Sequence, residues 1–413
     1  MANAGMGDRT PVEASFGGFP MSQFDKDDVE DMGLLKLDVL GIRMQSSFAH
    51  CLSEIGRTCG PEQVPDVDHL APFDDAQVFD MIGHAQTLGC FQIESPGQRE
   101  LVGKFGPDNF NDIIIDISLF RPGPVKSGMV VPFLDARQGW TQPRYLHPSL
   151  APVLDQTYGV VVYHEQVIEI ISVVTGCSLA KADEVRRSLG DFQGQQQARE
   201  WFLPRALLRG YPLQVAERIW TVLASFASFG FCKAHSAAFA LPTYQSAWLK
   251  RHWPAHFIAG VLTHDPGMYP KRLLVEEARR MGVQILGLDV NSSGAGYRVE
   301  RLHRVDRSFQ PPPGLPDGSD WGIRLALSEV KGVEASAVVR IEAGQPYESL
   351  SDFWMRAQVA APVVENLIVV GAFDALYGIN IARRRIGRLQ VRRRDLLLRL
   401  ADLKRIGQVE ART

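Results

Sequence analysis

A lysine and an aspartate stand two residues apart in the otherwise apolar stretch MGLLKLDVLGIR, residues 32–43. Apolar and polar residues alternate through its centre, which favours a β-strand with one buried face. Lys36 and Asp38 would then project together from the other face. A carboxylate beside a cation on a strand is typical of a metal or phosphate site, although a solvated strand face has the same pattern. This pair is therefore a candidate site for chemistry.

Further along the chain, a set of polar residues has the chemistry to bind a triphosphate. It comprises an arginine before a Pro-Gly-Pro turn, two adjacent helical arginines and three residues at an expected helix start: Arg121, Arg186, Arg187, Lys233, His235 and Ser236. Arginine forks and a lysine near a helix N-terminus supply the several donors that such an anion needs. Each residue also has a structural interpretation: bracing a turn, forming a solvated helix face, or capping a helix.

The elements expected to position these residues are mainly short helices. HEQVIEIISVVTG (164–176) has an apolar stripe and a glycine stop, and SLAKADEVRRSLG (178–190) opens at Ser178 and closes at Gly190. Upstream, PMSQFDKDD and GLLKLDVLG are predicted to form neighbouring strands. Downstream, YRVERLHRV and WGIRLAL alternate as the strands of a hairpin, and the proline- and glycine-rich stretch SFQPPPGLPDGSDWG between them indicates a boundary.

The C-terminal part carries a pattern typical of DNA-backbone binding. In LSEVKGVEASAVVRIEAG (327–344) a glycine turn separates two helical stretches, which is how a helix-hairpin-helix unit presents N–H groups to a phosphate. A second unit is expected around Gly371. The alternative is an αα-hairpin that only packs, because Glu334 replaces the usual second turn glycine. The candidate DNA-binding residues are Lys331, Gly332, Arg340, Arg392, Arg393 and Arg394. The last three belong to an arginine- and leucine-rich stretch (382–405) expected as an amphipathic helix or a solvated face.

Composition sets broad limits on the class of protein. The 413 residues, 45% hydrophobic and 22% charged with a net charge of −3, are ordinary for a globular chain of two or three domains. No apolar run approaches the ~20 residues that span a bilayer, and the N-terminus lacks the pattern of a secretion signal, so we expect a cytoplasmic protein. Five cysteines without a C-x-x-C pair indicate neither disulfides nor zinc. Pro254 lies between His252 and His256, which disfavours a metal-binding helix there.

Five ordered blocks resemble the C-family bacterial DNA polymerases, the group of the polymerase III alpha subunit. The blocks are FPMSQFDKDDVEDMGLLKLDVLGIR, LFRPGPVKSGMV, LDQTYGVVVYHEQVIEI, ADEVRRSLG and FGFCKAHSAAFALPTYQSAWLK, and the match runs from about residue 19 to about residue 376. CKAHSAAFALPTYQ and THDPGMYPKRLLVEEARRMG are more similar to the error-prone, damage-inducible branch.

The resemblance implies a mainly α fold with small β portions. Its expected domains are a partial palm (1–60), helical fingers (61–285), a β-hairpin and tandem helix-hairpin-helix region (286–376) and a basic C-terminal helix (377–413). Asp38 matches the third of three palm aspartates that hold two Mg²⁺ ions in the family, and Lys36 lies beside it. The six triphosphate candidates fall in matching blocks of the fingers, where the resemblance implies nucleotide binding.

The function implied is DNA-directed DNA synthesis, in the error-prone branch during translesion repair. The family's paired Asp-x-Asp residues are not among the blocks matched, so we expect this chain alone to be inactive. The implied partners are primer-template DNA, deoxynucleoside triphosphates, the N-terminal half of the polymerase, the sliding clamp and accessory translesion proteins, although no obvious clamp-binding peptide follows the helix-hairpin-helix segment. The alternatives are a non-catalytic DNA-binding protein derived from a polymerase, and a truncated product without activity.

Overall fold

The computed structural model describes residues 6–34, 41–120, 130–190, 192–226, 231–303, 308–379 and 391–410. These residues belong to two units, Met1–Ile42 and Arg43–Thr413. In the first unit, β1 (Val12–Ala14) pairs antiparallel with β2 (Pro20–Ser22), and α1 (Lys26–Asp31) follows. We predicted that residues 20–28 form a strand beside residues 33–41. In the structure, the strand partner of β2 is β1, and residues 26–31 form a helix. Residues 35–40 of the second predicted strand lie outside the described residues.

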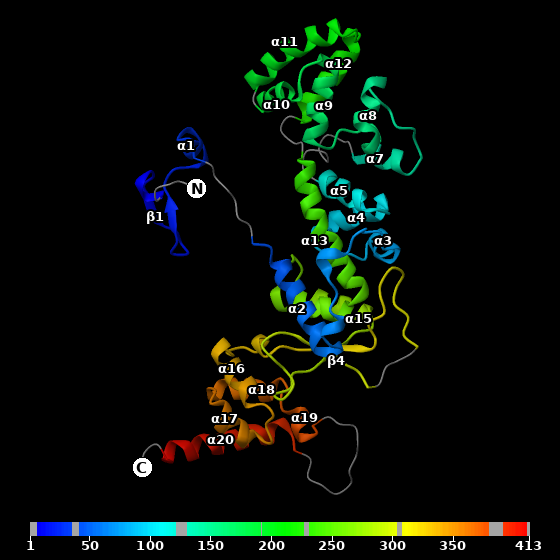
Figure 1. Cartoon of the computed structure of the whole chain (residues 1–413). Helices are drawn as coiled ribbons and strands as arrows, with labels where there is room; N and C mark the ends of the chain where they lie inside the picture. The colour runs from blue at the N-terminus through cyan, green and yellow to red at the C-terminus, as the bar shows by residue number, and fades with distance from the viewer. Residues whose placement is uncertain are drawn as a thin grey trace. The chain divides into compact units, whose positions relative to one another are not determined.

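The second unit is almost entirely helical in its first part (Figure 1). Its α-helices there are α2 (Arg43–Cys59), α3 (Ala76–Gly83), α4 (Pro96–Phe105), α5 (Phe110–Leu119), α7 (Val130–Arg137), α8 (Ala151–Leu154), α9 (His164–Thr175), α10 (Leu179–Ser188), α11 (Phe192–Leu208), α12 (Leu213–Phe226), α13 (Lys233–His252), α14 (Pro254–His264) and α15 (Lys271–Arg280). Short 3₁₀ turns at Pro61–Gln63, Val67–His69, Pro148–Leu150 and Asp155–Thr157 connect them. A mainly α fold with small β portions is thus confirmed.

The helix α13 organises the first core of this unit. It packs against α5 and α3, and its buried residues Ala240, Tyr244 and Ala247 join the apolar side chains of α3, α4 and α5. The helix α14 instead packs closely on α2. Gly260 permits that approach, because a Cβ there would lie 2.3 Å from the Ser47 carbonyl oxygen. The helix α13 is thus held by α3 and α5, and α14, which follows it, is held by α2.

A second core is formed by the helices from α8 through α12. The ends of two of these helices, α9 and α10, match the sequence prediction closely. The helix α9 ends at Gly176, whose φ of 74° is the left-handed conformation that favours glycine. The helix α10 begins after Ser178, whose side chain accepts from the Lys181 N–H. In both cases local residues determine the ends of the helix, which explains why the sequence was sufficient.

The predicted hairpin is confirmed and belongs to a three-stranded sheet. β4 (Arg298–Arg301) and β5 (Trp321–Arg324) pair antiparallel, and β3 (Gln284–Leu286) pairs parallel with β5, which is therefore the central strand. The short β3 was not predicted, because three residues are too few to show an alternating pattern.

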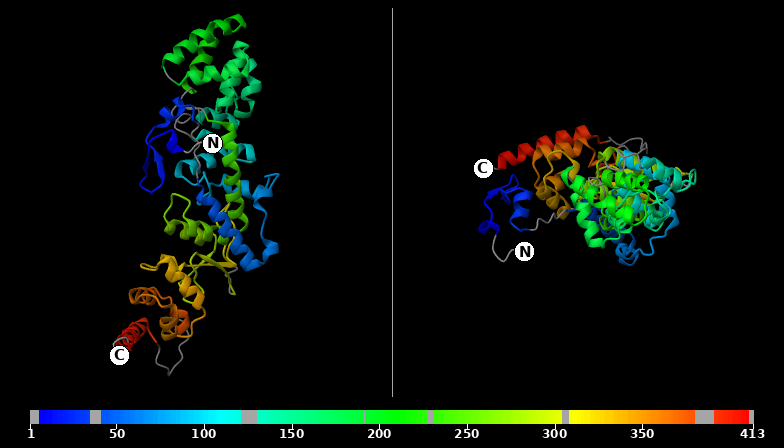
Figure 2. Two further views of the ribbon diagram at one scale, coloured as in Figure 1. Left: turned by 60° about the vertical axis from the view of Figure 1, so that its left-hand side comes forward. Right: turned by 90° about the horizontal axis from the view of Figure 1, so that it is seen from above.

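The last core contains α16 (Ala335–Gly344), α17 (Leu350–Ala357), α18 (Ala361–Val369), α19 (Asp374–Tyr377) and α20 (Arg393–Glu410). Figure 2 shows α20, in red, beside the orange helices of this core, and Leu396 and Leu400 are its buried residues. The predicted amphipathic helix is confirmed from Arg393 onward, whereas residues 380–390 lie outside the described residues. The helical stretch expected before Gly332 is only a 3₁₀ turn, Leu327–Glu329.

Candidate functional site

Three of the sequence-predicted site residues cannot be placed. Lys36 and Asp38 lie outside the described residues, as does Arg121. Among the residues that the structure does describe, no group of three His, Cys, Asp or Glu side chains is arranged to hold a metal ion. The predicted metal site and the predicted turn arginine therefore rest on the sequence alone.

The start of α13 is held by the segment that leads into α9. Tyr163 and Phe231 form a parallel β-bridge, and the His164 N–H donates to the Phe231 carbonyl at 2.9 Å. The Lys233 N–H, the first amide of α13, donates to both carboxylate oxygens of Glu165 at 3.0 Å. The predicted helix N-terminus is thus present, and an internal carboxylate already occupies its anion position.

The ammonium group of Lys233 is also placed by α9 and the turn before it. Its Nζ donates to Gln156 Oε1 at 2.9 Å and lies 5.4 Å from the centre of the Tyr163 ring. Such a cation–aromatic contact adds a modest attraction to a hydrogen bond. Lys233 therefore has a defined orientation, with its side chain still partly exposed.

The arginine pair of α10 borders the same segment. Arg186 and Arg187 both form ion pairs with Asp183, at 2.9 and 2.8 Å, and the Arg187 side chain is 73% exposed while that of Arg186 is 20% exposed. Burial, followed by the nearby positive charge of Arg186, holds the pKa of His164 below its usual value. The helix α10, which carries Arg186, packs against α9, and the amide of Lys233 contacts Glu165 of that same helix α9.

His235 and Ser236 have different surroundings although they are adjacent. The His235 ring is exposed and lies between two phenylalanine rings, with centroids 5.2 Å from Phe231 and 4.4 Å from Phe239. Ser236 is fully buried, and its hydroxyl bonds to the Ser118 hydroxyl at 2.5 Å. A buried hydroxyl with a partner cannot contact a triphosphate in this conformation, so the prediction for Ser236 is replaced by a packing role between α13 and α5.

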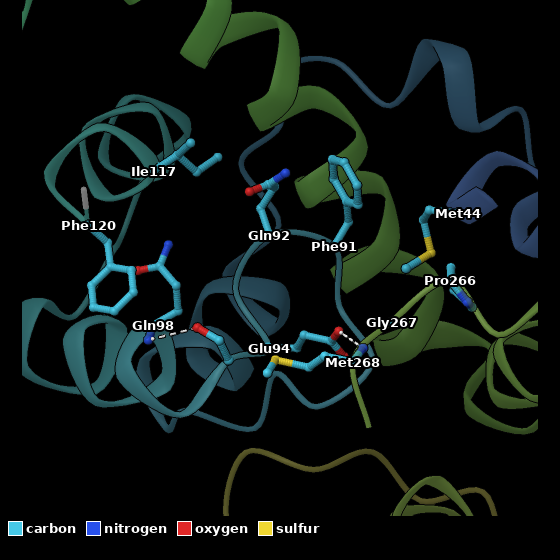
Figure 3. A pocket seen from close by; sticks show the side chains of 11 residues that line it. Met44, Phe91, Gln92, Glu94, Gln98, Ile117, Phe120, Pro266, Gly267 and Met268 are labelled. Atoms are coloured by element: carbon cyan, nitrogen blue, oxygen red, sulfur yellow. Dashed lines mark hydrogen bonds between the residues drawn. The ribbon is translucent and has the colours of Figure 1, made fainter. Parts of the chain in front are cut away.

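A cavity of about 410 Å³ lies near the start of α4 (Figure 3). Its lining side chains are mixed apolar and polar, and none carries a positive charge: Met44, Phe91, Gln92, Glu94, Ser95, Gln98, Ile117, Phe120, Pro266, Gly267 and Met268. Glu94 accepts N–H donors from Met268 at 3.0 Å and Gly89 at 3.2 Å, while burial raises the pKa of its carboxyl. The sequence prediction did not identify this cavity, because its walls come from segments far apart in the chain.

Behind the cavity, α4 and α5 share a buried polar contact. Gln98 Nε2 donates to Asp116 Oδ2 at 3.3 Å, and burial raises the pKa of Asp116 well above its ordinary value. Burial disfavours the charged form of this carboxyl, because a buried carboxylate without a cation is costly. Phe91, on the cavity wall, stacks on Phe239 at 5.7 Å, and that ring links the cavity to His235.

The turns of the two predicted helix-hairpin-helix units, at Gly332 and Gly371, differ in how accessible they are. At the first, Gly332 has a φ of 83°, and the nearest atom to an added Cβ would be a Val363 methyl at 3.9 Å. Lys331 beside it is exposed. At the second, Gly371 has a φ of 91°, and an added Cβ would lie 2.3 Å from the Arg393 guanidinium. The first hairpin is accessible to a phosphate, whereas an arginine covers the second.

The remaining basic candidates are partly engaged in holding the fold together. Arg393 pairs with Asp374 at 2.5 Å and donates to the Val369 carbonyl at 2.8 Å, and Arg340 donates to the Ala357 carbonyl at 3.2 Å. Arg392 and Arg394 are exposed. Of the predicted arginine trio, the two outer members are thus available to a phosphate and the central one anchors α20.

Two family models match parts of this chain. Residues 51–208 match the bacterial DNA polymerase III alpha subunit finger domain, and residues 282–386 match the helix-hairpin-helix motif. The chain is a relative of the C-family bacterial DNA polymerases. It is 38% identical over 382 residues to the error-prone DNA polymerase of Symbiobacterium thermophilum, covering 89% of this chain and 34% of that protein.

A second relative is the DNA polymerase III subunit alpha of Escherichia coli K12, 37% identical over 376 residues, which are 87% of this chain and 31% of that subunit. The error-prone DNA polymerase of Teredinibacter turnerae is 35% identical over 90% of this chain and 35% of its own length. The chain thus spans about a third of the length of these C-family relatives. Within the described residues, we find no helix that is both long and apolar enough to cross a membrane.

Proposed function

We propose that this chain supplies the nucleotide-binding fingers and a DNA-binding region of an error-prone DNA-directed DNA polymerase that acts in translesion synthesis. The observation that carries the proposal is that two basic helices meet α9: the first amide of α13, that of Lys233, contacts Glu165, and α10, which carries Arg186, packs against α9. The relatives' names and the two family matches support the same function. The alternative is a non-catalytic DNA-binding protein that keeps only the helix-hairpin-helix function.

In this proposal the incoming deoxynucleoside triphosphate binds to basic and polar side chains of the fingers. Arg186, Arg187, Lys233 and His235 would contact it, and Arg121 joins them from its place in the sequence block. Several cations are needed because a triphosphate carries several charges that must lose their water together. Ser236 is left out, since its hydroxyl is buried against Ser118.

The proposed catalytic residues are Lys36 and Asp38, with Asp38 as a ligand of Mg²⁺. The metal pair of such enzymes aligns a primer hydroxyl with the α-phosphate and stabilises the charge that develops there. Because these two residues lie outside the described ones, their role rests on the K-x-D pattern of residues 36–38 and on the resemblance. The further carboxylates would come from the family's paired palm aspartates.

DNA is proposed to bind at the C-terminal region. The open hairpin at Gly332 with Lys331, and the exposed Arg392 and Arg394, suit phosphate oxygens, and none of them is tied to base recognition. The proposed domain bounds are 1–60, 61–285, 286–376 and 377–413. The proposed location is the cytoplasm. The proposed protein partners are the sliding clamp and accessory translesion proteins. Arg340 and Arg393 contribute by holding α17 and α20 in place.

The test is equilibrium binding of a fluorescent deoxynucleoside triphosphate to the 413-residue chain, followed by anisotropy. Arg186→Ala and Lys233→Ala should each weaken binding about tenfold, the typical effect of removing a charged hydrogen bond. Arg199→Ala is the matched control, because Arg199 pairs with Glu217 at 3.6 Å on α12 and should change affinity less than about twofold. Equal losses of nucleotide affinity in all three variants would contradict the proposal that Arg186 and Lys233 bind the triphosphate. DNA binding without any nucleotide binding would favour the non-catalytic alternative.

A further inference from the structure

Glu165 connects two helices that the proposed nucleotide site needs. It lies in the first turn of α9 and its carboxylate meets the first amide of α13, 68 residues later in the chain. The first amides of a helix have no acceptor within the helix. Cys232, the N-cap residue of α13, makes no side-chain capping bond. Glu165 therefore caps α13 from outside, and its negative charge also suits the positive end of the helix.

The contact also determines where Lys233 points. The Lys233 amide is held by Glu165 at 3.0 Å, and its ammonium is held at the other end by Gln156 and by the Tyr163 ring. The bridge between Tyr163 and Phe231 fixes the residues just before Lys233. The segment Tyr163–Glu165 thus orients the backbone of this lysine and, together with Gln156, its side chain.

The same carboxylate prevents a phosphate from using the first amide of α13. Both oxygens of Glu165 accept the Lys233 N–H, so this amide has no free direction for a second anion. The positive charges that remain around the segment are side-chain groups, namely the ammonium of Lys233 and the guanidinium of Arg186. A triphosphate beside Lys233 would therefore be bound by side chains and not by this first amide.

We propose that Glu165 is a positioning residue for nucleotide binding: it holds Lys233 where the ammonium meets the triphosphate, and it keeps the first amide of α13 occupied. This inference rests on the proposed function, since it assigns Lys233 to the nucleotide. In the opposite role, the carboxylate would compete with the phosphate for the helix N-terminus. Removing its charge would then raise the affinity for the triphosphate, whereas our proposal predicts a lower affinity.

The first experiment measures the affinity of the 413-residue chain for the same fluorescent triphosphate with three variants at this position. Glu165→Gln keeps the shape and one acceptor oxygen, so we expect a loss of only a few-fold. Glu165→Asp is one methylene too short to reach the amide, and Glu165→Ala has no acceptor, so both should lose about tenfold. Tighter binding by Glu165→Gln than by the unchanged chain would overturn the inference.

A double-mutant cycle with Lys233→Met separates positioning from a general loss of structure. If Glu165 acts through Lys233, then Glu165→Ala should cost little more once Lys233 is gone. Full additivity of the two losses would overturn the inference. No binding by the unchanged chain would instead refute the proposed function, and the inference with it. Binding by the unchanged chain that is insensitive to all three Glu165 variants would refute only the inference.

The Cys232 thiol gives a local measurement that needs no nucleotide. Its sulfur lies 3.5 Å from Glu165 Oε1, and Cys232 is exposed. Glu165→Gln changes the group that this thiol contacts, so the rate of its reaction with a disulfide reagent should change several-fold. The reaction is assigned by its disappearance in Cys232→Ser. An unchanged rate in Glu165→Gln would show that the contact is not made in solution and would overturn the inference.

Discussion

The buried ion pair between Lys250 and Glu277 anchors the loop that forms one wall of the cavity. Lys250 Nζ on α13 lies 2.6 Å from Glu277 Oε1 on α15, and the two side chains are 0% and 1% exposed. The same ammonium donates to the carbonyls of Gln86 and Leu88 at 2.9 Å. All three of its donors are thus satisfied, and two of them hold the chain just before the cavity residue Phe91.

We predict that Lys250→Met lowers the free energy of unfolding by about 3 to 5 kcal/mol, the usual result of removing one partner of a buried pair. Methionine replaces the aliphatic stem, so little of the loss comes from packing. The substitution leaves two carbonyls and one carboxylate oxygen without a donor. Arg280 still bonds to the other oxygen of Glu277 at 2.7 Å. We therefore expect a value toward the lower end of the range.

The assay is urea unfolding of the 413-residue chain, followed by tryptophan fluorescence and circular dichroism. Lys104→Met is the matched control, because Lys104 pairs with Glu100 on the surface, where both side chains are more than half exposed. Its effect should stay below about 1 kcal/mol. A loss below about 1 kcal/mol for Lys250→Met, or one equal to the control, would refute the view that this pair holds the loop.

Three further predictions concern packing, pH and DNA. Gly260→Ala should cost at least about 2 kcal/mol of stability, because its Cβ would lie 2.3 Å from the Ser47 carbonyl, whereas Gly83→Ala has open space and should change stability by less than about 1 kcal/mol; urea unfolding compares them. Burial lowers the pKa of His256 from 6.5 to about 4, so the folded state binds fewer protons than the unfolded chain between these pH values. Up to about 3 kcal/mol of stability, complete above pH 6.5, should be lost as the pH falls toward 4, and His256→Gln should flatten that dependence in unfolding measured across pH. Replacing both Arg392 and Arg394 by alanine should weaken duplex binding and reduce the slope of log affinity against log salt by about 2, whereas Arg393→Ala should mainly lower the unfolding temperature of the C-terminal core; an unchanged salt slope would show that the exposed arginines do not meet phosphates.

Local signals in the sequence were enough for several elements. The ends of α9 and α10 follow from Gly176 and Ser178, and the strands β4 and β5 follow from their alternating residues. The start of α13 at Lys233 was also predicted. Each of these features is determined by neighbours within a few residues. They are therefore visible without knowing the fold.

Predictions that depended on distant partners were less complete. β2 pairs with β1, and the stretch before Gly332 is a 3₁₀ turn, because local propensity does not decide which neighbour a short segment finds. Arg393 was predicted as a DNA contact, but Asp374 holds it in an ion pair. The sequence could not show that pairing, since the two residues are neighbours only after α20 folds back onto α18.

The sequence by itself determined the mainly helical class, the family resemblance and the list of charged residues with suitable chemistry. Only the tertiary structure decided which of these charges are free. It buried Ser236 against Ser118 and placed Glu165 at the first amide of α13. It also assembled the cavity from four separate segments. The physical reason is that residue type and periodicity are local properties, whereas desolvation and the pairing of charges depend on which surfaces come together across the chain.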